Sequence, residues 1–182
     1  MQRKPILPPA YACRNANSKE QDCQQVVNDT CIFEYQSSPG YGCAGMPGGY
    51  SICIFVSGNV VRRDYVLEEE TPEKETIPAT MPELARRICA IIEGHLQELK
   101  SIPGELNNGS PDGSHDCFRF GEKRISAWHI QRTDPVEIRH HNPRYFEPFR
   151  DNMKYENSVL DIYDEIAREI NRHNVGVQMD SL

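Results

Sequence analysis

The sequence predicts an α+β fold, in which an antiparallel sheet of about five strands carries two main helices on one face. A meander of strand-like runs surrounds a glycine-rich loop at 39–49, and a shorter hairpin follows at 117–130. Amphipathic helices are expected at 82–101 and 156–173, because apolar residues recur there at the helical period. These elements account for the predicted sheet and for the helices that pack on it.

The first strand is predicted from a two-residue period over 31–36, in which Cys31 shares a face with Phe33 and Tyr35. The same period returns beyond the glycine-rich loop. The three residues around Gly58 are typical of a tight hairpin turn. The sequence therefore predicts consecutive antiparallel strands here.

The first long helix is predicted from a start signal and an apolar stripe. Thr80 and Glu83 have the spacing of a capping box, in which the threonine hydroxyl accepts a hydrogen bond from the first turn. The stripe consists of Leu84, Ile88, Ile91, Ile92, Leu96 and Leu99. Before it, the acidic, proline-containing segment 68–80 predicts a solvated loop. On the last helix, a solvated face is expected from Asp161, Asp164, Glu165 and Glu169.

Length and charge limit the classes of protein. A chain of 182 residues typically forms one domain, so we expect an N-terminal arm at 1–17 and a single α+β domain at 18–182. A net charge of −7 argues against a nucleic-acid partner, which needs a basic surface. Without a signal-peptide pattern or a long apolar run, the sequence predicts no membrane partner and a cytoplasmic location.

The seven cysteines make the chain cysteine-rich, and a cytoplasmic location together with their odd number predicts reduced thiols. Cys43, flanked by small residues, is a candidate nucleophile. Thiolates and imidazoles that would suit zinc are Cys13, Cys23, Cys31, Cys43, His115, Cys117, His129, His140 and His141. Of these, His115, Cys117, His140 and His141 have the closest spacing, but there is no Cys-x-x-Cys pair. We therefore expect no cofactor, and keep both sites as alternatives.

An aromatic and arginine-rich segment at 131–155 has no clean periodicity. Aromatic residues in such a segment usually anchor it to the core, because a long ordered loop loses much entropy. The alternative is a recognition surface, since aromatic and arginine side chains contribute most of the energy of protein interfaces. Its candidate residues are Arg144, Tyr145, Phe146, Phe149 and Arg150.

The absence of a coherent catalytic motif makes a non-enzymatic protein-binding module, inhibitory or regulatory, the leading functional hypothesis. The alternatives are a small enzyme that uses Cys43 as a nucleophile and a zinc-binding protein. Self-association through exposed sheet edges would also give a homo-oligomer.

A resemblance supports the leading hypothesis. The order of strand, glycine-rich loop, Tyr50-x-Ile52-x-Ile54, Gly58-x-Val60, helix, hairpin and helix resembles that of small uncharacterised bacterial proteins and, more distantly, emfourin-type protease inhibitors. The resemblance covers roughly 30–130 and implies direct binding to a thermolysin-like metalloprotease, without catalytic residues. The segment 131–182 departs from the compact pattern of that family.

Overall fold

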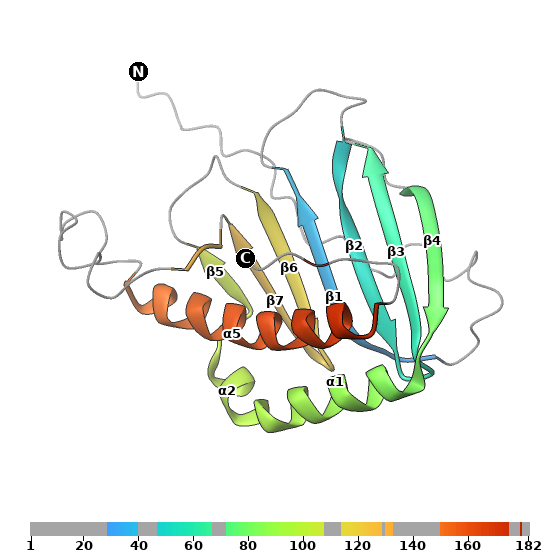
Figure 1. The fold of residues 1–182 in the computed structure, drawn as a ribbon. Coiled ribbons are helices and arrows are strands. Elements are labelled where there is room, and N and C mark those ends of the chain that lie inside the picture. The colour runs from blue at the N-terminus through green and yellow to red at the C-terminus, as the bar shows by residue number, and fades with distance from the viewer. Residues whose placement is uncertain are drawn as a thin grey trace, which may run out of the picture.

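The computed structural model describes residues 29–39, 47–66, 72–107, 114–128, 130–132, 150–174 and 179. Within these ranges the chain forms one seven-stranded sheet and three helices (Figure 1). The strands are β1 (Cys31–Ser38), β2 (Pro47–Phe55), β3 (Asn59–Val66), β4 (Pro72–Thr80), β5 (Glu105–Asn107), β6 (His115–Phe120) and β7 (Lys123–Trp128). The helices are α1 (Pro82–Gly94), α2 (Leu96–Ser101) and α5 (Arg150–Arg172).

The strands lie in the order β4-β3-β2-β1-β6-β7-β5, so β1 is central. Among the described strands, every pairing is antiparallel except that of β5 with β7. The predicted α+β class, the meander and the hairpin are thus confirmed. The sheet is larger than the predicted five strands, because β4 and β5 extend it at its two edges.

The prediction of a solvated loop at 68–80 was wrong for β4. This strand pairs with β3 along most of its length, and Arg63 faces Glu75 directly across the two strands. The Arg63 Nε lies 2.6 Å from Glu75 Oε2. Backbone ladder bonds and a cross-strand ion pair therefore outweigh the low strand propensity of an acidic sequence.

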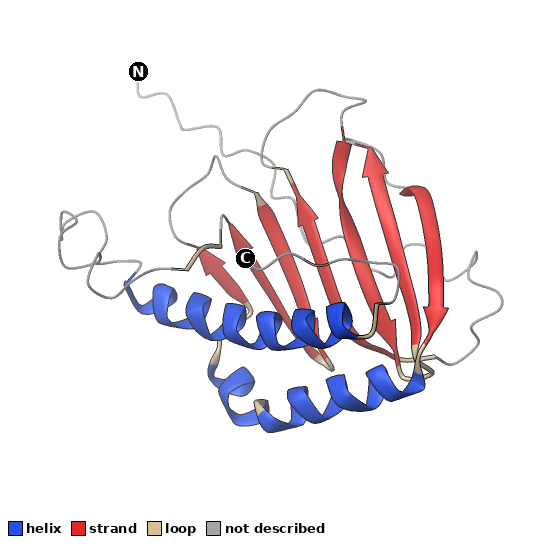
Figure 2. Ribbon diagram, in the orientation of Figure 1, coloured by secondary structure: helices blue, strands red, loops and turns tan. Residues whose placement is uncertain are grey.

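The face of the sheet toward α5 is aromatic and closely packed. Tyr163 of α5 is fully buried, and its ring centroid lies 4.9 Å from that of Tyr35 and 5.8 Å from that of Phe118. Tyr35 and Phe118 are each 1% exposed. Figure 2 shows the helices and the sheet as two layers. Burial of such side chains contributes roughly 1.5–3 kcal/mol each, so this contact fixes α5 on the sheet.

The turn between β2 and β3 also positions the start of α1. The Gly58 N–H donates to the Phe55 carbonyl, which closes the predicted hairpin turn, and the Gly58 carbonyl accepts from the Met81 N–H. The predicted capping box is wrong in its contacts, because Thr80 Oγ1 donates to Asn59 Oδ1 and no side chain caps α1. The helix begins at Pro82, where the missing N–H of proline costs no hydrogen bond.

The predicted single helix at 82–101 is divided at His95 into α1 and α2. Gly94 precedes the break, and glycine is a weak helix former. His95 Nδ1 lies 3.0 Å from a Glu98 oxygen, and His95 Nε2 lies 3.1 Å from a Glu165 oxygen of α5. The break turns Leu96 away from the predicted stripe, so this side chain is 44% exposed.

α5 begins before the predicted range 156–173. Its acidic side chains were expected to be solvated, but Glu169 is only 8% exposed. Arg132 lies 2.7 Å from Asp161 and 2.5 Å from Asp164. Part of the predicted solvated face therefore holds the chain after β7 against α5.

We predict that Gly58→Ala destabilises the fold by at least about 2 kcal/mol, because φ is +92° and an added Cβ would lie 2.3 Å from the Met81 carbonyl carbon. The measurement is urea unfolding followed by circular dichroism. Gly94→Ala is the matched control, since a Cβ there meets nothing within 4 Å. It should leave stability unchanged or raise it by up to about 1 kcal/mol. Equal effects of the two substitutions would contradict this account of the turn.

We predict that His95 stabilises the fold at acidic pH. Hydrogen bonds to Glu98 and then to Glu165 raise the pKa of His95. A group whose pKa is higher in the folded state stabilises fully below its unfolded value, about 6.5, and this stabilisation is lost as the pH rises through the folded value. His95→Gln should therefore cost up to about 1 kcal/mol at pH 5.5, because water screens the pair, and less at pH 9. Glu93→Gln, at an exposed position of α1, is the control, and a pH-independent loss in His95→Gln would disprove the explanation.

Candidate functional site

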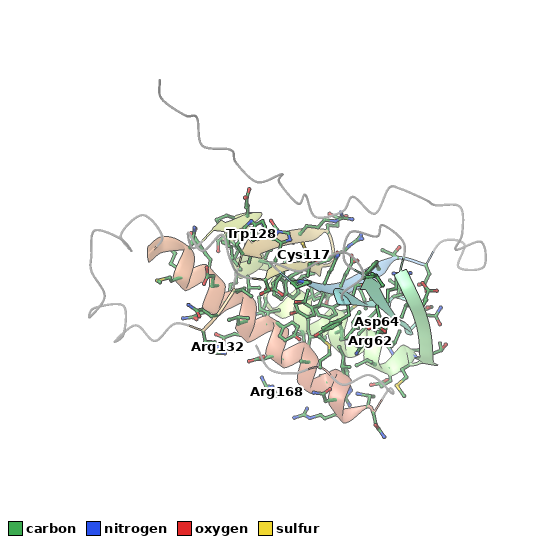
Figure 3. The ribbon with its side chains drawn as sticks, turned by 90° about the horizontal axis from the view of Figure 1, so that it is seen from above. Arg62, Asp64, Cys117, Trp128, Arg132 and Arg168 are labelled. Carbon is green, nitrogen blue, oxygen red and sulfur yellow. The ribbon has the colours of Figure 1, made fainter. Side chains whose placement is uncertain are left out.

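The face of the sheet opposite the aromatic core carries thiols and charged side chains. Tyr35 contacts α5, so the alternation of β1 turns Glu34 to the other face. Cys53 and Arg119 are the cross-strand neighbours of Glu34 and share that face. In the view from above, Cys117 and Trp128 lie on the side of the sheet away from α5 (Figure 3). We call this side the thiol face.

A β-bulge brings Cys31 to the thiol face. The register of β1 against β2 shifts between Cys31 and Phe33. Ile32 and Phe33 both belong to the apolar core, at 6% and 0% exposed. Cys31 is consequently on the same side as Glu34, three residues later, which a regular strand does not allow. The predicted grouping of Cys31 with Phe33 and Tyr35 is therefore wrong.

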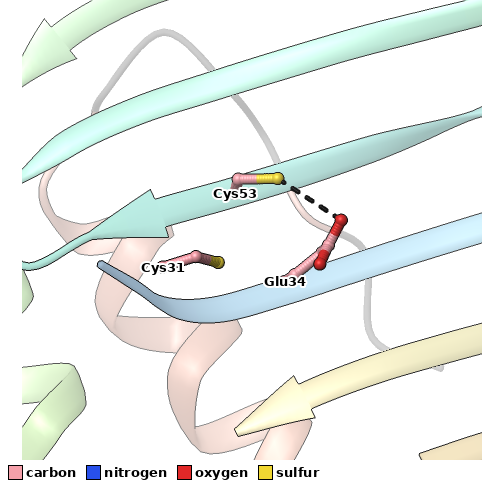
Figure 4. A group of neighbouring side chains, drawn as sticks. All are labelled: Cys31, Glu34 and Cys53. Atoms are coloured by element: carbon pink, nitrogen blue, oxygen red, sulfur yellow. Dashed lines mark hydrogen bonds between the residues drawn. The ribbon is translucent and has the colours of Figure 1, made fainter. Parts of the chain in front are cut away.

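Cys31, Glu34 and Cys53 form a compact group (Figure 4). One donor atom from each lies within 4.8 Å of the other two. The Cys53 thiol donates to Glu34 Oε1 over 3.6 Å. Arg63 Nη1 lies 3.4 Å from Cys53 Sγ, and the same guanidinium is paired with Glu75. We call Cys31, Glu34 and Cys53 the Cys-Glu-Cys cluster.

The two thiols differ in environment. Cys53 is 3% exposed, whereas Cys31 is partly exposed. The hydrogen bond with Cys53 is the largest cause of the lowered pKa of Cys31, and burial opposes it. The same bond, followed by burial and the charge of Glu34, raises the pKa of Cys53. The pKa shifts thus run in opposite directions, so the thiolate costs less at Cys31 than at Cys53.

The donor set suits a soft divalent metal. Thiolate sulfur is a preferred ligand of zinc, and carboxylate oxygen is also a common one. A search of the described residues for histidine, cysteine and acidic side chains close enough to share an ion finds the Cys-Glu-Cys cluster. The arrangement also brings two oxidisable sulfurs within 4.8 Å of each other, and proximity is one of the requirements for a disulfide.

The predicted metal alternative at His115, Cys117, His140 and His141 does not form within the described residues. Cys117 is disulfide-bonded, so its sulfur is not available as a thiolate, and the prediction that all seven cysteines are reduced is wrong for it. His115 Nδ1 lies 3.8 Å from Cys117 Sγ. The His115 ring packs at a tilt against that of Trp128, with ring centroids 4.6 Å apart, and burial lowers the pKa of His115. His140 and His141 lie outside the described residues.

Other predicted site residues also lie outside the described residues. They are the zinc-donor candidates Cys13, Cys23 and His129, the candidate nucleophile Cys43 and, on the predicted recognition surface, Arg144, Tyr145, Phe146 and Phe149. Arg150 is the first residue of α5, but its side chain is not among those described. The recognition surface and the cysteine nucleophile therefore stay predictions.

Sequence reasoning included Cys31 among the zinc donors but missed Glu34 and Cys53. The available signal was the hairpin register, because an antiparallel pairing of 31–36 with the next strand sets Glu34 opposite Cys53. The bulge that adds Cys31 has no comparable signature in the sequence.

No described helix is long and apolar enough to cross a membrane. Comparison of the chain with protein-family models, curated proteins and solved structures gave no match. The likeness to emfourin-type inhibitors stays a prediction.

Proposed function

We propose that this protein binds a divalent soft metal ion, best matched by Zn²⁺, through Cys31, Glu34 and Cys53. The observation that carries the proposal is the convergence of three donor atoms within 4.8 Å of one another. They come from two central, adjacent strands, which hold ligands more firmly than loops do.

The spacing of the donors is close to that of a tetrahedral site. With Zn–S bonds of about 2.3 Å and a Zn–O bond of about 2.0 Å, neighbouring ligands of a tetrahedral ion lie roughly 3.5–3.8 Å apart. The donor atoms of the Cys-Glu-Cys cluster need to approach one another by about 1.3 Å or less to reach that spacing. Side-chain rotation provides such a movement without changing the sheet.

Charge supports a cation at this position. Both thiols and Glu34 carry negative charge when they act as ligands, and Cys53 is buried, where unpaired charge is costly. Arg63 is near Cys53, but Glu75 pairs with its guanidinium at 2.6 Å. A divalent ion would therefore neutralise most of the charge that the Cys-Glu-Cys cluster develops.

Three protein ligands leave one tetrahedral position for water or an external ligand. Zinc sites that act on substrates share this arrangement, whereas structural sites have four protein ligands. The partial exposure of Cys31 gives solvent access to this side of the cluster. The proposal thus concerns a metal site that is open to a further ligand.

We predict that the full chain, reduced and stripped of metal, binds one Co²⁺ at the Cys-Glu-Cys cluster with a thiolate-to-metal charge-transfer band, and that Zn²⁺ displaces it. Cys31→Ser and Cys53→Ser should each weaken binding more than about 100-fold, beyond the loss typical of outer-shell changes. Glu34→Gln should weaken it less and keep the band, because both sulfurs remain.

Cys89→Ser is the matched control for these titrations. Cys89 is a partly exposed free thiol on α1, remote from the thiol face, so its loss should leave affinity and spectrum unchanged. Thermal unfolding of each metal-free variant checks that the fold is retained. Unchanged binding in a Cys31→Ser/Cys53→Ser double variant would overturn the assignment of the site.

A further inference from the structure

The two sulfurs of the Cys-Glu-Cys cluster differ in solvent exposure, so a reagent from solvent does not reach them equally. Cys31 is partly exposed, whereas Cys53, on the adjacent strand β2, is 3% exposed. Their sulfur atoms are within 4.8 Å of each other. A reagent from solvent would therefore meet Cys31 first, with a second thiol already beside it.

We propose that Cys31 and Cys53 are an oxidant-responsive pair that a hydroperoxide converts reversibly to a disulfide. The proposal goes beyond metal binding and does not depend on it. Oxidation of accessible thiols next to a resolving cysteine is a general route to protein disulfides.

The reaction has two balanced steps. Cys31 sulfur attacks the terminal oxygen of the hydroperoxide, the O–O bond breaks, and Cys31 becomes a sulfenic acid while the leaving oxygen takes a proton to form an alcohol or water. Cys53 sulfur then attacks the Cys31 sulfur, an S–S bond forms, and the hydroxyl leaves as water. The two sulfurs together give up two electrons, and the hydroperoxide accepts them. A thiol reductant reverses the result by exchange.

The neighbours of Cys53 are placed to assist the second step. The Cys53 thiol donates to Glu34 Oε1 over 3.6 Å, so this carboxylate can take the proton that Cys53 loses on attack. Arg63 Nη1, 3.4 Å from Cys53 Sγ, stabilises the negative charge on sulfur. Glu34 and Arg63 thus favour closure of the disulfide rather than the first attack.

The test treats the full chain with hydrogen peroxide in the presence of a chelator and maps its peptides. Cleavage before aspartate and after aromatic residues would separate Cys31 in peptide 29–33 from Cys53 in peptide 51–55, with Cys43 in peptide 42–50. The expected product is peptide 29–33 linked to peptide 51–55, and it should disappear on reduction. Cys31 linked mainly to another cysteine, or oxidised no faster than Cys89, would overturn the proposal.

Two variants separate the steps. Cys53→Ser should leave Cys31 as a sulfenic acid that dimedone traps, because the resolving thiol is absent. Glu34→Gln should form that sulfenic acid at least as fast as wild type, because the charge of Glu34 raises the pKa of Cys31, but it should close the disulfide at least about tenfold more slowly, as expected for loss of a general base. Equal closure rates in Glu34→Gln and wild type would overturn the role of Glu34.

The outcomes also separate this proposal from metal binding. If the linked peptide forms but cobalt does not bind, the oxidant-responsive pair is supported and the metal site is rejected. If cobalt binds but the linked peptide does not form, the metal site is supported and the oxidant-responsive pair is rejected. If both hold, Zn²⁺ should slow oxidation of Cys31, because the metal and the hydroperoxide would compete for the same sulfur electrons.

Discussion

The β-bulge near the start of β1 is the constraint on which the Cys-Glu-Cys cluster depends. In a regular strand, Cys31 would lie on the same face as Phe33 and Tyr35, toward the helices. Glu34 would then lie on the opposite face from Cys31. The bulge instead sends both Ile32 and Phe33 into the core and turns Cys31 outward. Bulges commonly re-aim a side chain at the expense of local pairing. Here the core loses no apolar contact, because Ile32 occupies the face that Cys31 leaves.

The position of β1 within the sheet makes this arrangement rigid. β1 is hydrogen-bonded to β2 on one side and to β6 on the other, and its core face is fixed by the contact of Tyr35 with Tyr163. A change in the conformation of Glu34 is therefore limited to side-chain rotation, whereas Cys31, beside the bulge, is paired with Phe55 of β2 and precedes the ladder with β6. Donor groups on central strands lose little conformational entropy on binding, so a three-ligand site there needs less binding energy than the same residues on loops.

Elements that depend on contacts between residues close in sequence were predicted correctly, whereas elements that depend on distant contacts were not. The turn at Gly58 and the first three strands depend on neighbours in sequence and are predicted correctly. β4 depends on pairing with β3, where Arg63 meets Glu75, and an acidic sequence gives no local sign of it. The break at His95 follows Gly94, and there His95 contacts Glu165 in another helix, a pairing that the local sequence does not indicate. The candidate site was missed for the same reason, because register and a bulge bring its three residues together.

The electrostatic balance around Cys53 allows one cluster to serve both chemistries. Arg63 alone would repel a metal ion, since its guanidinium lies 3.4 Å from the sulfur. Glu75 offsets that charge at 2.6 Å, so the guanidinium still donates a hydrogen bond while adding little net positive charge. Glu34 then acts as a ligand oxygen when a cation is present and as a proton acceptor when it is absent. Metal binding and disulfide closure both require Cys53 to lose its proton. The charge of Arg63 lowers the pKa of Cys53, whereas the hydrogen bond with Cys31, burial and the charge of Glu34 raise it, so Glu34 helps only by binding the cation or by taking up the proton.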